Sequence, residues 1–108
     1  MGKYPEALEA LNRAISLAAG VENAELYLDR ARCYLNLGKF EKALEDAQRA
    51  LDMEPDHSGA IRILAISLIE MERYEEAIPL LDRYLQKHPE DWSAWRIKLG
   101  SLGVDRKK

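Results

Sequence analysis

The sequence predicts an all-α protein, and three observations support this fold class. Apolar residues recur at the spacing of one helical face, as at positions 27, 31, 34 and 35. No stretch alternates apolar and polar residues with the period of two that a half-buried strand shows. Similar segments return about every 34 residues, which is typical of a protein built from stacked helical repeats.

Six helices are expected, separated by short connections. Gly20 and Gly38 interrupt the apolar pattern, and Pro55 and Pro89 end helices because proline cannot continue the backbone hydrogen bonding. Connections of about two to five residues are normal between antiparallel helices. The predicted helices span 4–18, 23–37, 40–53, 58–71, 74–87 and 91–101.

The first, third and fifth helices are three copies of one segment. Each copy opens with an aromatic residue and carries an alanine three positions later. These pairs are Tyr4 and Ala7, Phe40 and Ala43, and Tyr74 and Ala77. The second, fourth and sixth helices correspond to one another in the same way, and Tyr27, Ile61 and Trp95 occupy one shared position.

The repeated unit resembles the tetratricopeptide repeat, a 34-residue helix–turn–helix. The copy that carries most of the family's signature residues has Tyr27, Ala31, Tyr34, Gly38, Phe40, Ala43, Ala50 and Pro55. The resemblance covers about residues 2 to 100 and implies a right-handed α-solenoid of antiparallel helix pairs. Small alanines would let paired helices approach closely.

The repeat register predicts one domain over residues 1–103. It consists of the second helix of a partial repeat, two full repeats and a terminal helix, followed by a tail. The corresponding ranges are 2–23, 24–57, 58–91, 92–103 and 104–108.

Composition narrows the class of protein. The chain has 108 residues, 47% of them hydrophobic, and a net charge of −3, which disfavours a nucleic-acid partner. The most apolar stretch, AIRILAISLI at 60–69, is shorter than the roughly 20 residues that span a bilayer. The first ten residues contain no apolar segment of a signal peptide. We therefore expect a cytoplasmic protein with no membrane insertion.

No group of residues in the sequence predicts an enzyme, a cofactor or a metal site. His57 and His88 fall at helix boundaries, 31 residues apart, without ligands at metal-binding spacing. The single cysteine, Cys33, is expected to be a buried, inert thiol. The six glycines are scattered, so no phosphate-binding loop is predicted.

The resemblance implies a protein-interaction scaffold that binds a peptide or helix in a concave groove. In the family, the first helix of each repeat lines this groove. The residues placed there by register are Leu28, Asp29, Arg32, Arg62, Ile63, Ile66, Ile69 and Arg96. The side of helix 58–71 opposite its inward stripe carries Ile63, Ile66 and Ile69, and contiguous exposed isoleucines usually mark an interaction site. Alternatively, neighbouring helices cover them.

The three arginines of this set suit a partner with acidic residues or a C-terminal carboxylate. The alternative is ordinary ion pairing with Asp29, Glu25 or Glu70. The carboxylate clamp of chaperone-binding members needs lysine, asparagine and arginine at positions that carry other residues here. These positions are Leu28, Arg32, Ile63, Ser93 and Ile97. Binding of heat-shock protein tails by that clamp is therefore disfavoured.

Two other functions remain open at the sequence level. In the first, the chain self-associates through its terminal helices, with Leu8, Leu11 and Ile15 forming the contact and a homo-oligomer as the product. In the second, the chain is an accessory domain excerpted from a larger protein.

Overall fold

The computed structural model describes residues 3–17 and 23–103, which form six α-helices. Their bounds are α1 Tyr4–Leu17, α2 Ala24–Asn36, α3 Phe40–Met53, α4 Ser58–Glu70, α5 Tyr74–Lys87 and α6 Trp92–Ser101. No strand occurs in these two ranges. The all-α prediction is confirmed, and the described helix ends agree with the predicted ones to within one residue. The tail predicted at 104–108 and the break predicted at Gly20 lie outside the described residues.

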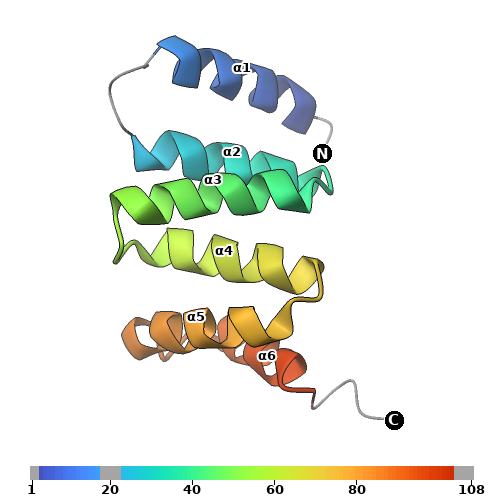
Figure 1. Cartoon of the computed structure of the whole chain (residues 1–108), viewed down its shortest axis with the longest axis vertical. Coiled ribbons are helices and arrows are strands. Elements are labelled where there is room, and N and C mark those ends of the chain that lie inside the picture. The colour runs from blue at the N-terminus through green and yellow to red at the C-terminus, as the bar shows by residue number, and fades with distance from the viewer. Residues whose placement is uncertain (1–2, 18–22, 104–108) are drawn as a thin grey trace.

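The helices stack in chain order along the 48 Å long axis of the molecule, as Figure 1 shows. Each pairs with its neighbours in the sequence, and α2 on α3 and α4 on α5 are the most extensive pairs. α2 also touches α4, so the first helices of successive repeats are in direct contact. This is the arrangement of a helical solenoid, in which each element packs against those beside it.

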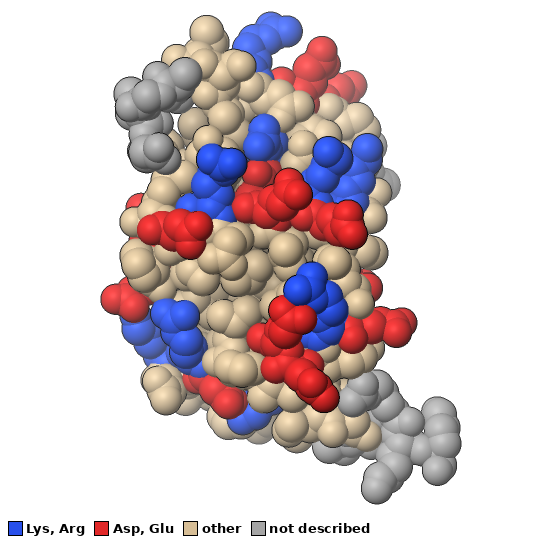
Figure 2. All heavy atoms as spheres, viewed as in Figure 1, with Lys and Arg blue, Asp and Glu red and all other residues tan. Residues whose placement is uncertain are grey.

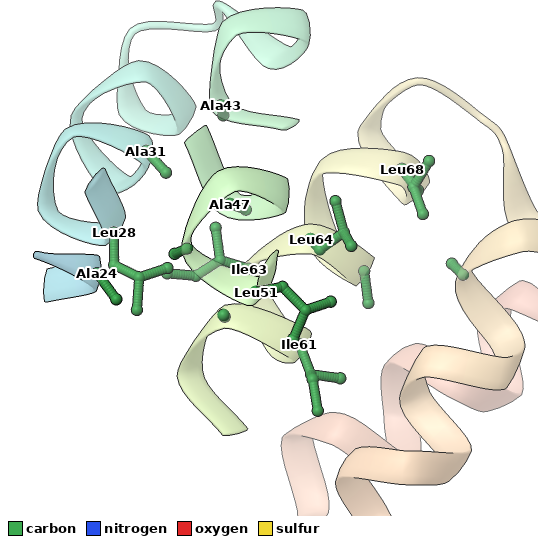
Figure 3. Close-up of a cluster of buried hydrophobic side chains, with 14 of the residues drawn as sticks. Ala24, Leu28, Ala31, Ala43, Ala47, Leu51, Ile61, Ile63, Leu64 and Leu68 are labelled. Carbon is green, nitrogen blue, oxygen red and sulfur yellow. The ribbon is translucent and has the colours of Figure 1, made fainter. Parts of the chain in front are cut away.

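Alanines set the close spacing inside each repeat. Ala31 and Ala43 of the α2–α3 pair are fully buried, and so are Ala65 and Ala77 of the α4–α5 pair. Figure 3 shows Ala31, Ala43 and Ala47 in the core with the larger Leu28, Leu51 and Ile61. Small side chains at the crossing let larger ones fill the space around it.

The apolar character of α4 follows from its central place in the stack. α4 packs against α2, α3 and α5, and seven of its residues are buried. They are Ala60, Ile61, Ile63, Leu64, Ala65, Ser67 and Leu68. The Ser67 hydroxyl is satisfied there because it donates a 2.8 Å hydrogen bond to the Ile63 carbonyl. A helix covered on several sides has no need of a polar face.

A largely buried ion pair ties the first three helices together. The Arg30 guanidinium of α2 donates two hydrogen bonds, of 2.7 and 2.9 Å, to the Asp46 carboxylate of α3. A third, of 2.9 Å, reaches the Asn12 side chain of α1. The guanidinium also lies over two aromatic rings, with its Cζ atom 5.7 Å from the ring centre of Tyr27 and 5.8 Å from that of Tyr34. The hydrogen bond to Asp46 also raises the pKa of Arg30.

The turns after α2 and α4 have the same backbone geometry but different residues. Gly38 has φ of 78° and Glu72 has φ of 60°, both in the left-handed region. In each turn the next backbone N–H bonds a carbonyl five residues back, Lys39 to Tyr34 and Arg73 to Leu68, both at 2.8 Å. This helix stop favours glycine, so Glu72 is strained where Gly38 is not.

We predict that Glu72→Gly raises the free energy of unfolding by about 1 kcal/mol, because glycine adopts the left-handed conformation without steric cost. Urea denaturation followed by circular dichroism measures the change. The matched control is Gly38→Ala, whose added Cβ meets no atom within 4 Å. The free energy of unfolding of that variant should be about 1 kcal/mol lower, because alanine is strained in the left-handed backbone conformation. An unchanged or less stable Glu72→Gly protein would contradict the assignment of strain.

We predict that Asp46→Ala lowers the free energy of unfolding by about 3 kcal/mol, because it leaves the Arg30 charge without its partner at a mostly covered site. The same urea titration applies. Glu76→Ala serves as the control, since the Arg73–Glu76 pair is exposed and its loss should have almost no effect. Equal losses in the two variants would contradict the structural role of Asp46.

Candidate functional site

The first helices of the repeats are α2, α4 and α6, and their surface is called here the first-helix face. α2 packs on α4, and side-chain contacts join α4 to the start of α6. His57, at the start of α4, places its Nε2 atom 2.7 Å from the Glu25 carboxylate of α2. Arg62 of α4 donates a 3.2 Å hydrogen bond to the Ser93 hydroxyl at the start of α6. These contacts hold the three helices side by side where the sequence predicted a groove.

Two of the predicted binding residues are buried, and the expectation that they would be exposed is wrong. Leu28 is fully buried and Ile63 is 5% exposed. The reason is that α2 and α4 touch, so side chains between them are enclosed, as Leu28 and Ile63 are in Figure 3. The alternative that neighbouring helices cover this side holds for Ile63. Neither residue contributes to the open surface.

The other two isoleucines differ in exposure and surroundings. Ile69 is partly buried and packs against the core cluster. Ile66 is also partly buried but is not part of that cluster. Ile66 is therefore the isoleucine of the predicted set that is left for contact with a partner. Further along the same register, Gly100 has open space where a side chain would be.

The three predicted arginines have different partners. Arg32 donates a 2.9 Å hydrogen bond to the Asp29 carboxylate, and both side chains are about half exposed, so the predicted ion-pairing alternative is confirmed for this pair. Arg62 lies 3.9 Å from Asp91, and its Nε atom is buried without a hydrogen-bond partner among the described residues. Arg96 is exposed on α6.

A series of helix caps occupies one repeat position and was not predicted. Asn23, His57 and Asp91 are spaced by 34 residues, and each directly precedes a first helix. The Asn23 side chain accepts from the Glu25 N–H, and His57 Nδ1 accepts from the Ala60 N–H. The spacing itself was the available signal, because polar residues are preferred at this position of a helix.

Among the ionisable groups of this face, Asp91 has the most strongly shifted pKa. One carboxylate oxygen accepts a 2.6 Å hydrogen bond from the Tyr84 hydroxyl. The other accepts from the Ser93 hydroxyl at 2.7 Å and from the Ser93 and Ala94 N–H groups. The Tyr84 bond first, then the Ser93 and Ala94 bonds and the Arg62 charge, lower the pKa of Asp91 to about 2. The same bond to Asp91 raises the pKa of Tyr84.

The two histidines and the cysteine, for which the sequence predicted structural roles, lie at helix ends and in the protein interior. His57 is the residue before α4 and caps its start, and His88 is the residue after α5, where its ring stacks on Tyr84. Cys33 is buried, and burial raises the pKa of its thiol. No three histidine, cysteine or carboxylate side chains converge to hold a metal ion within the described ranges. No described helix has the length and apolar character needed to span a membrane.

The face formed by α3 and α5 is different in character. Figure 2 shows acidic and basic residues interspersed there, with an uncharged band between the two charged rows. A hollow of about 340 Å³ lies in this region. Its lining residues are Leu44, Gln48, Leu51, Leu64, Leu68, Arg73, Glu76, Pro79 and Leu80. None of the predicted binding residues belongs to it.

Antiparallel helix pairs stacked in one row, with the first helices sharing a face, define a domain of the tetratricopeptide-repeat class. The profile of the family described as "Anaphase-promoting complex, cyclosome, subunit 3" matches residues 1–84. The chain belongs to this family of tetratricopeptide-repeat type.

Curated relatives share part of their length with this chain. The Hsp70-Hsp90 organizing protein of Triticum aestivum is 33% identical over 88 residues, covering 81% of this chain and 15% of the relative. Zinc finger CCCH domain-containing protein 7B of Homo sapiens is 31% identical over 98 residues, covering 88% of this chain and 10% of the relative. The chain thus spans a small fraction of these relatives.

Solved structures share the fold at low sequence identity. One is described as "First TPR of Spaghetti (RPAP3) bound to HSP90 peptide SRMEEVD", with a TM-score of 0.86, 23% identity, and coverage of 98% of this chain and 85% of that one. Another is "MamA 41-end from Desulfovibrio magneticus RS-1", with a TM-score of 0.87 and 22% identity. The match covers 96% of this chain and 58% of that one.

We predict that the stabilising effect of Asp91 disappears in acid. Because its folded-state pKa of about 2 lies below the ordinary 3.8, its contribution is present above pH 4 and is lost as the pH falls toward 2. Urea unfolding of the native protein and Asp91→Asn, at pH 7 and at intervals from pH 5 to 2, measures this. The stability difference between the two should shrink across that interval, and a constant difference would contradict the prediction.

Proposed function

We propose that this domain is a protein-interaction module whose first-helix face binds a segment of a partner protein. The proposed segment has an apolar anchor side chain that meets Ile66, with acidic groups beside it that meet Arg32, Arg62 and Arg96. The observation that carries the proposal is the partial exposure of Ile66 on a face that also bears these three arginines.

The charges on this face favour an acidic ligand. Arg96 is exposed, and the pair that holds Arg32 is about half exposed, where ion pairs contribute little and exchange readily. The Arg62 side chain is 35% exposed, so a ligand carboxylate would meet the outer part of its guanidinium and not the buried Nε atom. Arginine binds carboxylates in a bidentate manner, which gives orientation as well as attraction.

The ligand proposed here differs from the one in a structurally similar protein. That neighbour is described as bound to an HSP90 peptide, SRMEEVD. In this chain, two of the positions that would form the usual carboxylate clamp are Leu28 and Ile63, which are buried. We therefore propose an internal acidic segment with a branched apolar anchor, and weak binding of that peptide.

The test is a selection from a random peptide library, followed by affinity measurement on the selected peptides by fluorescence anisotropy. Enriched peptides should combine an apolar residue with Asp or Glu. Ile66→Glu should weaken their binding at least tenfold, because burying an Ile contributes about 1.5–3 kcal/mol and each 1.4 kcal/mol is tenfold. Arg96→Glu should also weaken it.

The matched control is Gln48→Glu, which adds the same charge to the exposed surface of α3, away from the first-helix face. It should leave affinity unchanged, and circular dichroism should report the same helix content in all variants. Selected peptides that bind Ile66→Glu as tightly as the native protein would refute the proposed site. So would a selection with no preference for acidic residues.

A further inference from the structure

The hollow on the α3–α5 face combines an apolar interior with a polar edge. It is lined by α3, α4, α5 and the turn before α5, and neither outer helix, α1 or α6, contributes to it. Leu51, Leu64 and Leu68 of its lining are buried. Leu44 and Leu80 line it as well and are half-buried. A concave site of about 340 Å³ with mostly apolar walls and a few polar groups is typical of a binding site.

The equivalent place in the preceding repeat is filled by a side chain of the protein itself. There Arg30 of α2 binds Asp46 of α3 and Asn12 of α1. The guanidinium also lies over the ring of Tyr34. In the repeat register, the residues that correspond to Arg30, Asp46, Asn12 and Tyr34 all line the hollow; they are Leu64, Leu80, Gln48 and Leu68. The hollow is therefore the place that the Arg30 head group fills one repeat earlier.

The hollow exists because leucine replaces both members of that ion pair. Leu64 is shorter than Arg30 and carries no charge. Leu80 offers no acceptor at the position where Asp46 accepts two hydrogen bonds. A cationic group placed among these leucines would lose its hydration without gaining a partner, which is unfavourable. The group that suits this junction is therefore apolar.

The edge of the hollow offers one hydrogen-bond acceptor. Its two charged residues are paired with each other, because Arg73 donates hydrogen bonds of 2.9 and 2.8 Å to the Glu76 carboxylate. The Gln48 amide nitrogen donates a 3.0 Å hydrogen bond to the Asp52 carboxylate, which can only accept, so the nitrogen is on that side. The amide oxygen, Gln48 Oε1, accepts no hydrogen bond from the described residues and remains as the acceptor.

We propose that this hollow anchors a tryptophan or tyrosine side chain of a partner protein, with the indole N–H or phenol O–H donating to Gln48 Oε1. These side chains need apolar surroundings for the ring and a partner for the polar atom, and the hollow offers both. Phenylalanine or leucine would use the apolar walls alone. Tryptophan and tyrosine are also frequent anchors at protein interfaces. The site is separate from the first-helix face and does not depend on the function proposed for that face.

The probe for the test is N-acetyl-tryptophanamide, titrated into the protein with isotope-labelled leucine and isoleucine methyl groups and followed by NMR. The leucine signals of the hollow should shift together and fit one dissociation constant; these are Leu44, Leu64, Leu68 and Leu80. Signals of Leu8, Leu11 and Ile15, which are half-buried on α1, should stay in place. A short neutral peptide with one tryptophan between glycine and serine residues should bind at least as tightly as the amide.

Two variants test the apolar walls and the acceptor separately. Leu80→Phe places a ring of the protein in the hollow and should weaken binding of the amide about tenfold, since it removes the burial of the ligand ring. The native protein should prefer the amide over its indole-N-methylated derivative, which has no donor, by roughly threefold. Gln48→Leu should abolish that preference, and comparison of the two proteins corrects for the bulk of the added methyl group.

The matched controls make the same changes away from the hollow. Leu99→Phe lies at an exposed position of α6 and Gln86→Leu at an exposed position of α5, and neither residue lines the hollow. Both variants should bind the amide like the native protein. Circular dichroism should report the same helix content in all four variants.

The proposal would be overturned by unshifted leucine signals of the hollow at the highest soluble concentration of the amide. Equal binding by Leu80→Phe and the native protein would also overturn it, as would equal binding of the two amides by the native protein. An amide that binds where the peptide does not would replace the partner side chain with a free small molecule. Ile66→Glu should leave the titration unchanged, so this proposal and the one for the first-helix face succeed or fail separately.

Discussion

The close approach of the two helices within each repeat is the constraint on which the rest of the structure depends. It requires a small residue on both sides of each crossing, and Ala31, Ala43, Ala65 and Ala77 meet that need with full burial. A larger side chain at any of these points would separate the pair or force strained rotamers. The contact between α2 and α4 encloses Leu28 and Ile63, so the width and chemistry of the first-helix face follow from this packing.

The fold was predictable because its signals are local. Helical periodicity and the proline and glycine stops act within a few residues, and the 34-residue spacing repeats these local signals along the chain. Together they located the helix ends closely. The Arg30–Asp46 pair was not predictable in the same way. Its residues are 16 positions apart on two different helices, so helical periodicity gave no partner for either charge. Which charges meet across two helices depends on side-chain rotamers at their crossing.

The candidate site was predictable only in part, and the isoleucines of α4 show why. Periodicity identifies the stripe of a helix that faces its own repeat, and it placed Ile63, Ile66 and Ile69 together on the other side. It does not give the angle at which the next repeat packs. In the structure that packing buries Ile63 and leaves Ile66 partly exposed, although the two are three residues apart. The Asn23, His57 and Asp91 caps, in contrast, carried a periodic signal that went unused.

The uneven burial along the stack has a consequence for how the molecule opens. α1 has no buried residue, whereas α4 has seven. In an array where each helix is held only by its neighbours, local opening starts where the least apolar surface must be exposed. Amide hydrogens of α1 therefore exchange with solvent first and those of α4 last. The centre of the array, built around the least polar of the described helices, is therefore expected to be the unit that stays folded longest.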